Sequence, residues 1–219
     1  MDAGTGTLGE LRRHTSLADL DAIWISHMHA DHTSDLLTAY YGALYTDAKL
    51  TAPIPLYGPP GLSDRLADYL TNSEVRSVIA NAFAVEELHD GHKAEFGPLT
   101  LTSSAVTHGL PAFAVRIEAA GKSLVYSGDA APCESLTTLA SDCDVLLCEA
   151  GDNQPPEGLV PFHHTPEDAG ATAASAGARR LIVTHVNYAI TPEQAVTRAA
   201  SRFTGPIECA APGVTYSIG

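Results

Sequence analysis

The chain has 219 residues, 45% hydrophobic and 17% charged, a composition that predicts a packed globular protein rather than a disordered one. Twelve Lys and Arg against 26 Asp and Glu give a formal net charge of −14, which argues against a general binder of nucleic acid or anionic membranes. The cysteines form no CxxC pair, and neither a membrane span nor a signal peptide is visible, so we expect a cytoplasmic protein.

Short apolar runs predict strands along the whole chain, at 21–26, 54–57, 83–88, 94–107, 112–118, 122–127, 144–149, 180–184 and 207–217. Helical spacing of apolar side chains predicts helices over 33–45 and from Leu62. Two more helices are expected to begin after Thr165 and Thr191, which are placed as N-caps. Mixed strands followed by βα units indicate an α/β or α+β layered architecture, which we expect to form one domain over 1–219.

The strongest local signal is the run His-Met-His-Ala-Asp-His over 27–32, which directly follows the first predicted strand. In an extended stretch residues i and i+2 point the same way, so His27 and His29 can hold one ion between them. If the chain then turns, Asp31 and His32 can face a second position nearby. Imidazole nitrogen and carboxylate oxygen together suit Zn²⁺, and also Mn²⁺ or Fe²⁺.

Three later residues repeat this placement at the ends of other predicted strands. His108, Asp129 and His185 each stand just past the C-terminal end of an apolar strand. One histidine of this kind is more often a core or cap residue, whereas four strand ends with the same pattern favour convergence on one rim. We therefore predict a centre for two divalent ions there.

These residues, in this order and at these separations, resemble the metallo-β-lactamase-fold metallohydrolase superfamily along nearly the whole chain. The resemblance implies an αββα sandwich with two metal ions at one edge. Members normally carry one or two strands before the position of Asp2, so we expect either that the start of the sequence is misassigned or trimmed, or that the sheet lacks its first strands. The implied ligands are divided between the ions, with His27, His29 and His108 on the first, Asp31, His32 and His185 on the second, and Asp129 bridging both.

The flanking segments resemble the ribonuclease Z-like phosphodiesterase branch of that superfamily. The likeness lies in the Asp-x-Gly-x-Gly turn at 2–7, in the segment 106–116, in Glu149-Ala150 and in His163-His164-Thr165. In the branch, a Glu and a His are thought to relay a proton to the leaving group. By resemblance these roles fall to Glu149 and His163, and the choice between His163 and the neighbouring His164 stays open.

The implied reaction is hydrolysis by a hydroxide that bridges the two ions, with Asp31 orienting it or taking its proton. A small phosphodiester or an RNA end is the favoured substrate. The charge of −14 and the lack of a long insertion between Arg116 and Asp129 argue against tRNA. The first alternative is a thioester, lactone or β-lactam hydrolase, since the same ions polarise a carbonyl. The second alternative is a non-catalytic, oligomer-forming remnant with a retained metal site. A homodimer is possible under each of these interpretations.

Two further groups of aromatic side chains have no strand-end placement. The tyrosines of the helix expected over 33–45 are interpreted as helix-face packing, with a pocket wall as the alternative: Tyr40, Tyr41 and Tyr45. The histidines of polar stretches are interpreted as surface residues: His14, His89 and His92.

Overall fold

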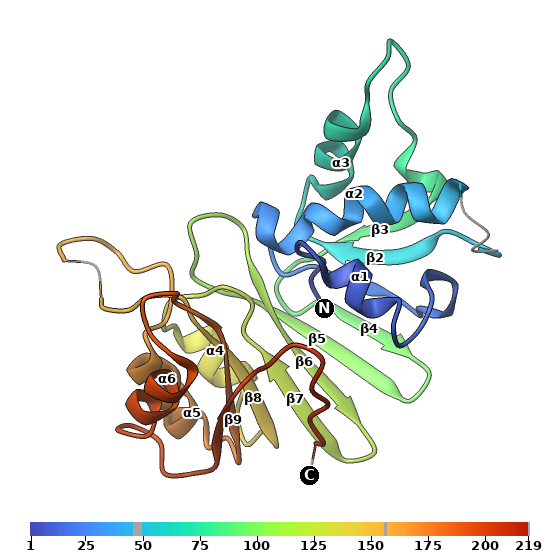
Figure 1. Cartoon of the computed structure of the whole chain (residues 1–219). Coiled ribbons are helices and arrows are strands. Elements are labelled where there is room, and N and C mark those ends of the chain that lie inside the picture. The colour runs from blue at the N-terminus through green and yellow to red at the C-terminus, as the bar shows by residue number, and fades with distance from the viewer. Residues whose placement is uncertain (46–49, 156, 219) are drawn as a thin grey trace. The chain divides into compact units, whose positions relative to one another are not determined.

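A computed structural model describes residues 1–45, 50–155 and 157–218. They divide into two compact units, a first unit over Met1–Leu88 and a second unit over His89–Gly219. Each unit is built around a sheet of its own (Figure 1). Among the described residues, no helix is long and apolar enough to cross a membrane. A single domain over 1–219 and a cytoplasmic location both stay predictions.

The first unit contains a three-stranded parallel sheet in the order β1-β2-β3, formed by β1 (Ile23–Trp24), β2 (Ile54–Gly58) and β3 (Phe83–Glu87). Its helices are α1 (Thr7–Leu11), α2 (Ala30–Tyr45) and α3 (Leu62–Leu70), with short 3₁₀ turns at Leu17–Asp19 and Ile79–Asn81. Helices α2 and α3 place Leu36 and Leu62 in one fully buried cluster with Leu56 of β2 and Phe83 of β3. Removing these apolar surfaces from water holds the helices to the sheet.

The second unit contains a seven-stranded sheet in the order β10-β9-β8-β7-β6-β5-β4. The strands are β4 (Lys93–Phe96), β5 (Leu99–Ala105), β6 (Phe113–Ala119), β7 (Lys122–Tyr126), β8 (Val145–Ala150), β9 (Leu181–Val186) and β10 (Ile207–Cys209). Strands β4 to β7 pair antiparallel, as hairpins allow, and β7 to β10 pair parallel. The C-terminal ends of the parallel strands therefore meet at one edge.

Three helices of the second unit pack into one buried cluster with its strands: α4 (Glu134–Leu139), α5 (Pro166–Ala176) and α6 (Pro192–Ala199). The predicted N-caps are confirmed, because the side-chain oxygens of Thr165 and Thr191 each accept a hydrogen bond from the backbone N–H three residues on. Gly177 ends α5 in the left-handed conformation, with φ of 67°. Small residues such as Ala173 and Ala195 let the helices approach closely.

Some predicted elements differ from the structure. The strand expected over 207–217 ends at Cys209, because Pro212 cannot donate a ladder hydrogen bond and Gly213 adopts a φ of 73°. The run 94–107 is two strands, β4 and β5, and the dipeptide Gly97-Pro98, which is typical of a turn, joins them as expected. Helices α1 and α4 were not predicted, since they are only 5 and 6 residues long and a helical period needs a longer window to be recognised.

Two of the side-chain interpretations are also wrong in part. Tyr40 packs as predicted, being 6% exposed, but Tyr41 is 45% exposed and Tyr45 is 75% exposed. His14 and His89 lie at the surface as expected, whereas His92 is buried. The turn between β3 and β4 accounts for this, because the backbone carbonyl of His92 accepts a hydrogen bond from Ser103 N of β5 and so fastens the residue to the sheet.

We predict that Gly170→Ala destabilises the second unit. A Cβ at residue 170 of α5 would lie 2.3 Å from the carbonyl oxygen of Ala199 in α6, so the two helices would have to move apart. The free energy of unfolding in urea should fall by roughly 1–3 kcal/mol, the usual effect of overpacking, although Ala favours a helix more than Gly. Gly9→Ala in α1, where a Cβ has open space, is the control and should show no loss. Equal stability of both variants would contradict this contact.

Candidate metal centre

In the first unit, the predicted motif connects the segment after β1 to the start of α2. His27 is fully buried, and its Nε2 lies 3.0 Å from Nδ1 of His29. Nε2 of His32 lies 3.5 Å from a carboxylate oxygen of Asp31. Donor atoms of His27 and His29 thus lie close together, as do those of His32 and Asp31, while the division of these residues between two ions stays a prediction.

Hydrogen bonds fix the orientation of two of these rings. Nδ1 of His27 donates to the Ser26 hydroxyl at 2.9 Å, and that hydroxyl donates to Asp2 at 2.9 Å. Nδ1 of His32 donates to the same carboxylate at 2.7 Å. A proton held on Nδ1 leaves the lone pair on Nε2, which is the form in which imidazole binds a metal. Asp2 thus supports both rings.

The role of Asp2 was missed by sequence reasoning, which gave the residue only as part of a turn. Its carboxylate also accepts a hydrogen bond from Ser26 N at 2.7 Å, and its own N–H donates to Trp24 O at 2.7 Å. It adopts a φ of 50°, which a non-glycine residue seldom does. The Asp-x-Gly-x-Gly pattern was the available signal, but a pattern does not show which ring the acid reaches.

In the second unit, Asp129 and His185 lie together. Asp129 follows β7, is 2% exposed, and has Oδ1 at 3.2 Å from Nδ1 of His185. His185 lies within β9 with a φ of 48°, at a register shift where Glu149 pairs with Thr184 and Ala150 with Val186. His185 is therefore the extra residue of a β-bulge, a device that turns a side chain out of the regular alternation.

The predicted Glu149–His163 pair is also formed. Glu149 is fully buried at the end of β8, and its carboxylate accepts hydrogen bonds from Ala130 N at 3.0 Å and Gly151 N at 2.6 Å. Nδ1 of His163 donates to it at 3.0 Å. This hydrogen bond is the main cause of a raised pKa for His163, with added attraction from the charges of Glu149 and Asp129 and some opposition from burial.

A glycine makes room for this group of rings. A Cβ at Gly151 would lie 2.9 Å from Nδ1 of His163 and 3.1 Å from Cδ2 of His185. The rings of those two histidines are stacked with centroids 5.7 Å apart. The ring of His108 lies 5.1 Å from that of His163, and its Nδ1 donates to Phe162 O at 2.8 Å. The second unit therefore gathers three imidazoles and two carboxylates.

His164 has a different environment from its neighbour. It is fully buried, with Nδ1 donating to Ala130 O at 2.5 Å and Nε2 accepting from the Thr172 hydroxyl at 3.1 Å. Burial lowers its pKa. Both nitrogens are thus used within the core of the second unit. Of the two candidates, His163 is the one beside Glu149 and Asp129.

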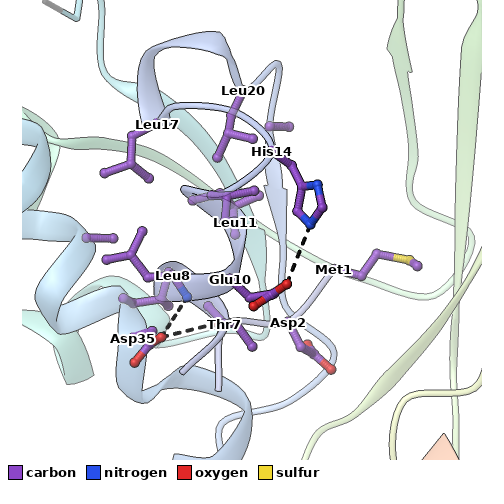
Figure 2. A pocket seen from close by; sticks show the side chains of 15 residues that line it. Met1, Asp2, Thr7, Leu8, Glu10, Leu11, His14, Leu17, Leu20 and Asp35 are labelled. Carbon is purple, nitrogen blue, oxygen red and sulfur yellow. Dashed lines mark hydrogen bonds and ion pairs between the residues drawn. The ribbon is translucent and has the colours of Figure 1, made fainter. Parts of the chain in front are cut away.

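A cavity of about 380 Å³ lies in the first unit, walled by Asp2 and by side chains of α1, the following 3₁₀ turn and α2 (Figure 2). Its wall is largely apolar, with Leu8, Leu11 and Leu17 among its residues. Its polar groups bond locally, since Asp35 accepts from Leu8 N at 2.7 Å and Glu10 faces His14 at 3.5 Å. We therefore place the chemistry at the motif and not in this cavity.

Comparison with known proteins agrees with this reading. A family model described as a beta-lactamase superfamily domain matches residues 1–186. The chain is 33% identical to an uncharacterized protein of Mycobacterium tuberculosis over 221 residues, covering all of this chain and 80% of that protein. It is 29% identical to ribonuclease Z of Mycobacterium bovis over 233 residues, covering 95% of this chain and 83% of the relative. The solved metallo-beta-lactamase fold protein YhfI from Bacillus subtilis matches with a TM-score of 0.81 and 24% identity, over 97% of this chain and 84% of that one.

The chain belongs to the beta-lactamase superfamily. It has the metallo-β-lactamase fold, and the predicted fold class is confirmed. The predicted likeness to ribonuclease Z is confirmed as well, so the chain is a member of a metallohydrolase superfamily with ribonuclease Z-like relatives.

We predict that His164 makes stability fall in mild acid. Because its pKa is lowered in the folded protein, the unfolded chain takes up this proton first, so the stability that neutral His164 contributes is present above its unfolded pKa. That contribution is lost as the pH falls below about 6.5, the usual histidine value. His164→Asn should show a smaller decrease of unfolding free energy than wild type in urea titrations from neutral pH down through this range.

The matched control is His89→Asn, at an exposed histidine, which should follow the wild-type curve. Measuring the difference between each variant and wild type cancels the opposite contribution of His163, whose raised pKa gives stability that is present in acid and lost as the pH rises. Parallel curves for wild type and His164→Asn would show that His164 does not titrate differently on unfolding.

Proposed function

We propose that this chain is a two-metal phosphodiesterase that hydrolyses a small phosphodiester. The observation that carries the proposal is the buried Glu149 carboxylate bonded to Nδ1 of His163, with Asp129 3.9 Å from the same nitrogen. A metal centre alone serves phosphate and carbonyl substrates equally. An imidazole kept ready to give a proton is needed most when the leaving group is a poor one, such as an alkoxide.

The proposed ligand atoms suit divalent transition-metal ions such as zinc. They are imidazole nitrogens and carboxylate oxygens, the ligands that zinc, manganese and iron take in hydrolases. In the proposal, the ligands are divided between two ions as the family resemblance implies. Two ions held there would polarise the phosphate and promote ionisation of water near neutral pH. Zinc is the preferred ion, with manganese or iron as alternatives.

Asp31 is the proposed proton acceptor. Its side chain is 64% exposed at the start of α2, while the neighbouring His32 is held by Asp2. A carboxylate that is open to solvent and 3.5 Å from a ligand nitrogen can orient an attacking water and take its proton.

His163 is the proposed proton donor. Glu149 holds the proton on Nδ1 and favours the charged ring, which raises its pKa toward the working pH. Nε2 can then give its proton to the departing alkoxide. Glu149 is a positioning residue in this scheme, since it acts through the imidazole and does not touch the substrate.

A small substrate is preferred over tRNA. The net charge of −14 disfavours long phosphate backbones. Strands β6 and β7 are joined by a tight turn, with Ala119 paired to Lys122, so Arg116 and Asp129 are connected without a long insertion. These features support a short phosphodiester or an RNA end as the substrate.

The direct test is hydrolysis of bis(p-nitrophenyl) phosphate by zinc-loaded protein, compared with a thioester and a lactone. We expect turnover of the phosphodiester, with much lower activity on the carbonyl substrates. The opposite preference would replace this function by the carbonyl alternative. Retained metal with no turnover of any ester would favour the non-catalytic alternative.

We predict that Asp129→Ala lowers the occupancy of both ions and abolishes hydrolysis, because one carboxylate is proposed to serve both. Elemental analysis of dialysed protein measures the ions per chain. Asp21→Ala, at an exposed acid of the first unit, is the control and should keep the wild-type metal content. Loss of one ion alone would make Asp129 a terminal ligand and not a bridge.

We predict that His163→Ala keeps its metal and loses rate by roughly 10²–10⁴-fold on an alkyl phosphodiester, the usual contribution of a positioned acid. The loss should be much smaller with a p-nitrophenolate leaving group, which departs without a proton. Glu149→Gln should show the same pattern more weakly.

His89→Ala, at an exposed histidine, is the control for this series and should match wild type on both substrates. Equal losses on the two leaving groups would argue against an acid role for His163. Loss of metal from His163→Ala would make it a ligand instead.

A further inference from the structure

A hollow of about 570 Å³ lies on the first unit and is lined by residues of α2 and of the end of α3. The two helices contact each other, and their course is drawn in Figure 1. Six of the residues that line it matter here: Ser34, Leu37, Thr38, Tyr41, Tyr69 and Asn72. Tyr41 is 45% exposed and Tyr69 is 74% exposed. Large aromatic side chains left open to water at the wall of a hollow are typical of binding surfaces.

The hollow begins next to the metal motif. Asp31, Ser34, Thr38 and Tyr41 follow one another at steps of three or four residues along α2, so they share one stripe of the helix. At 1.5 Å per residue, the Cα of Tyr41 lies about 15 Å along the axis from that of Asp31, and side chains of a helix lean toward its N-terminus, which brings the Tyr41 ring closer. A group attached to a phosphate held at Asp31 would therefore extend along this stripe toward Tyr41.

The side chains that line the hollow indicate which kind of substrate group, attached to the phosphate, would bind there. The lining residues named above carry hydroxyl, amide, aliphatic and aromatic groups and no charge, although the whole chain has a net charge of −14. These residues offer no cation to bind a phosphate and no carboxylate to bind a cation. A neutral planar ring can stack on the rings of Tyr41 and Tyr69. The side chains of Ser34, Thr38 and Asn72 can form hydrogen bonds with polar atoms at the edge of that ring.

We propose that this hollow is the subsite for a planar aromatic ring carried by the phosphodiester substrate, with Tyr41 and Tyr69 as its specificity-determining residues. This proposal rests on the proposed function, because it places the reacting phosphate at the metal motif. Tyr45 extends the surface beyond the hollow, since its ring stacks on that of Tyr41 with centroids 5.9 Å apart. That stacking holds the Tyr41 ring in place before any substrate arrives.

The test compares two esters with the same leaving group, thymidine 5′-p-nitrophenyl phosphate and methyl p-nitrophenyl phosphate, on the full zinc-loaded chain. Wild type should prefer the thymidine ester. In the double variant Tyr41→Leu/Tyr69→Leu, the ratio of the two kcat/KM values should fall by roughly 5- to 100-fold, the usual contribution of stacking one base. The change should lie in KM, since no reacting atom is touched.

The matched control is Tyr41→Phe/Tyr69→Phe, which keeps both rings and should keep the ratio. The single variant Tyr69→Leu, at a largely exposed position, covers the case in which the double variant does not fold. An unchanged ratio in the folded Leu variants would overturn the subsite. A wild-type dimer that becomes a monomer in the Leu variants, with no change in the ratio, would also overturn it and make the tyrosines an interface.

A binding measurement separates this proposal from the proposed function. If wild type hydrolyses neither ester, saturation-transfer NMR with thymidine 5′-monophosphate tests the hollow directly. Saturation of the base protons that is lost in the Leu variants and kept in the Phe variants would support the subsite while the phosphodiesterase proposal fails. No saturation in wild type would overturn the subsite itself.

Discussion

The candidate site of the second unit depends on one buried carboxylate. Glu149 is fully buried, and burying a charge is costly unless hydrogen bonds replace the lost water. Three groups supply them: Ala130 N from the segment after β7, Gly151 N after β8, and His163 from the loop before α5. The same carboxylate therefore fixes the backbone next to Asp129 and the ring of His163. Its hydrogen bond to His163 determines both the position of that ring and its affinity for a proton.

In the first unit, the carboxylate of Asp2 has the corresponding role of fixing imidazole rings. It accepts hydrogen bonds from Ser26 and His32, and Ser26 in turn orients His27. Each unit thus carries an acid that binds no substrate in the proposed scheme and instead fixes imidazole rings. Such outer partners set the tautomer and the direction of a ligand ring, which a metal ion alone does not impose on a free side chain.

The sequence was sufficient for the fold and for most of the candidate site, because strand ends are easy to locate. His27, Asp129 and Glu149 each follow a short apolar run, and such runs mark strands well. The bulge at His185 and the function of Asp2 could not be predicted, since both depend on pairing between distant segments. The burial of His92 and the exposure of Tyr41 have the same origin, because neighbours that pack against a residue leave no local signal. The choice of His163 over His164 required the positions of Ala130 and Thr172.

Residue 185 combines a left-handed backbone conformation, which favours glycine, with an imidazole side chain, which glycine lacks. A φ of 48° suits glycine, which has no side chain to hinder it, and an imidazole there carries a conformational cost. Under the proposed function the imidazole is needed at this position as a metal ligand, in spite of the conformational cost. A glycine at residue 185 would then be more stable but would lack the ligand, so stability and the proposed activity oppose each other at this one residue of β9.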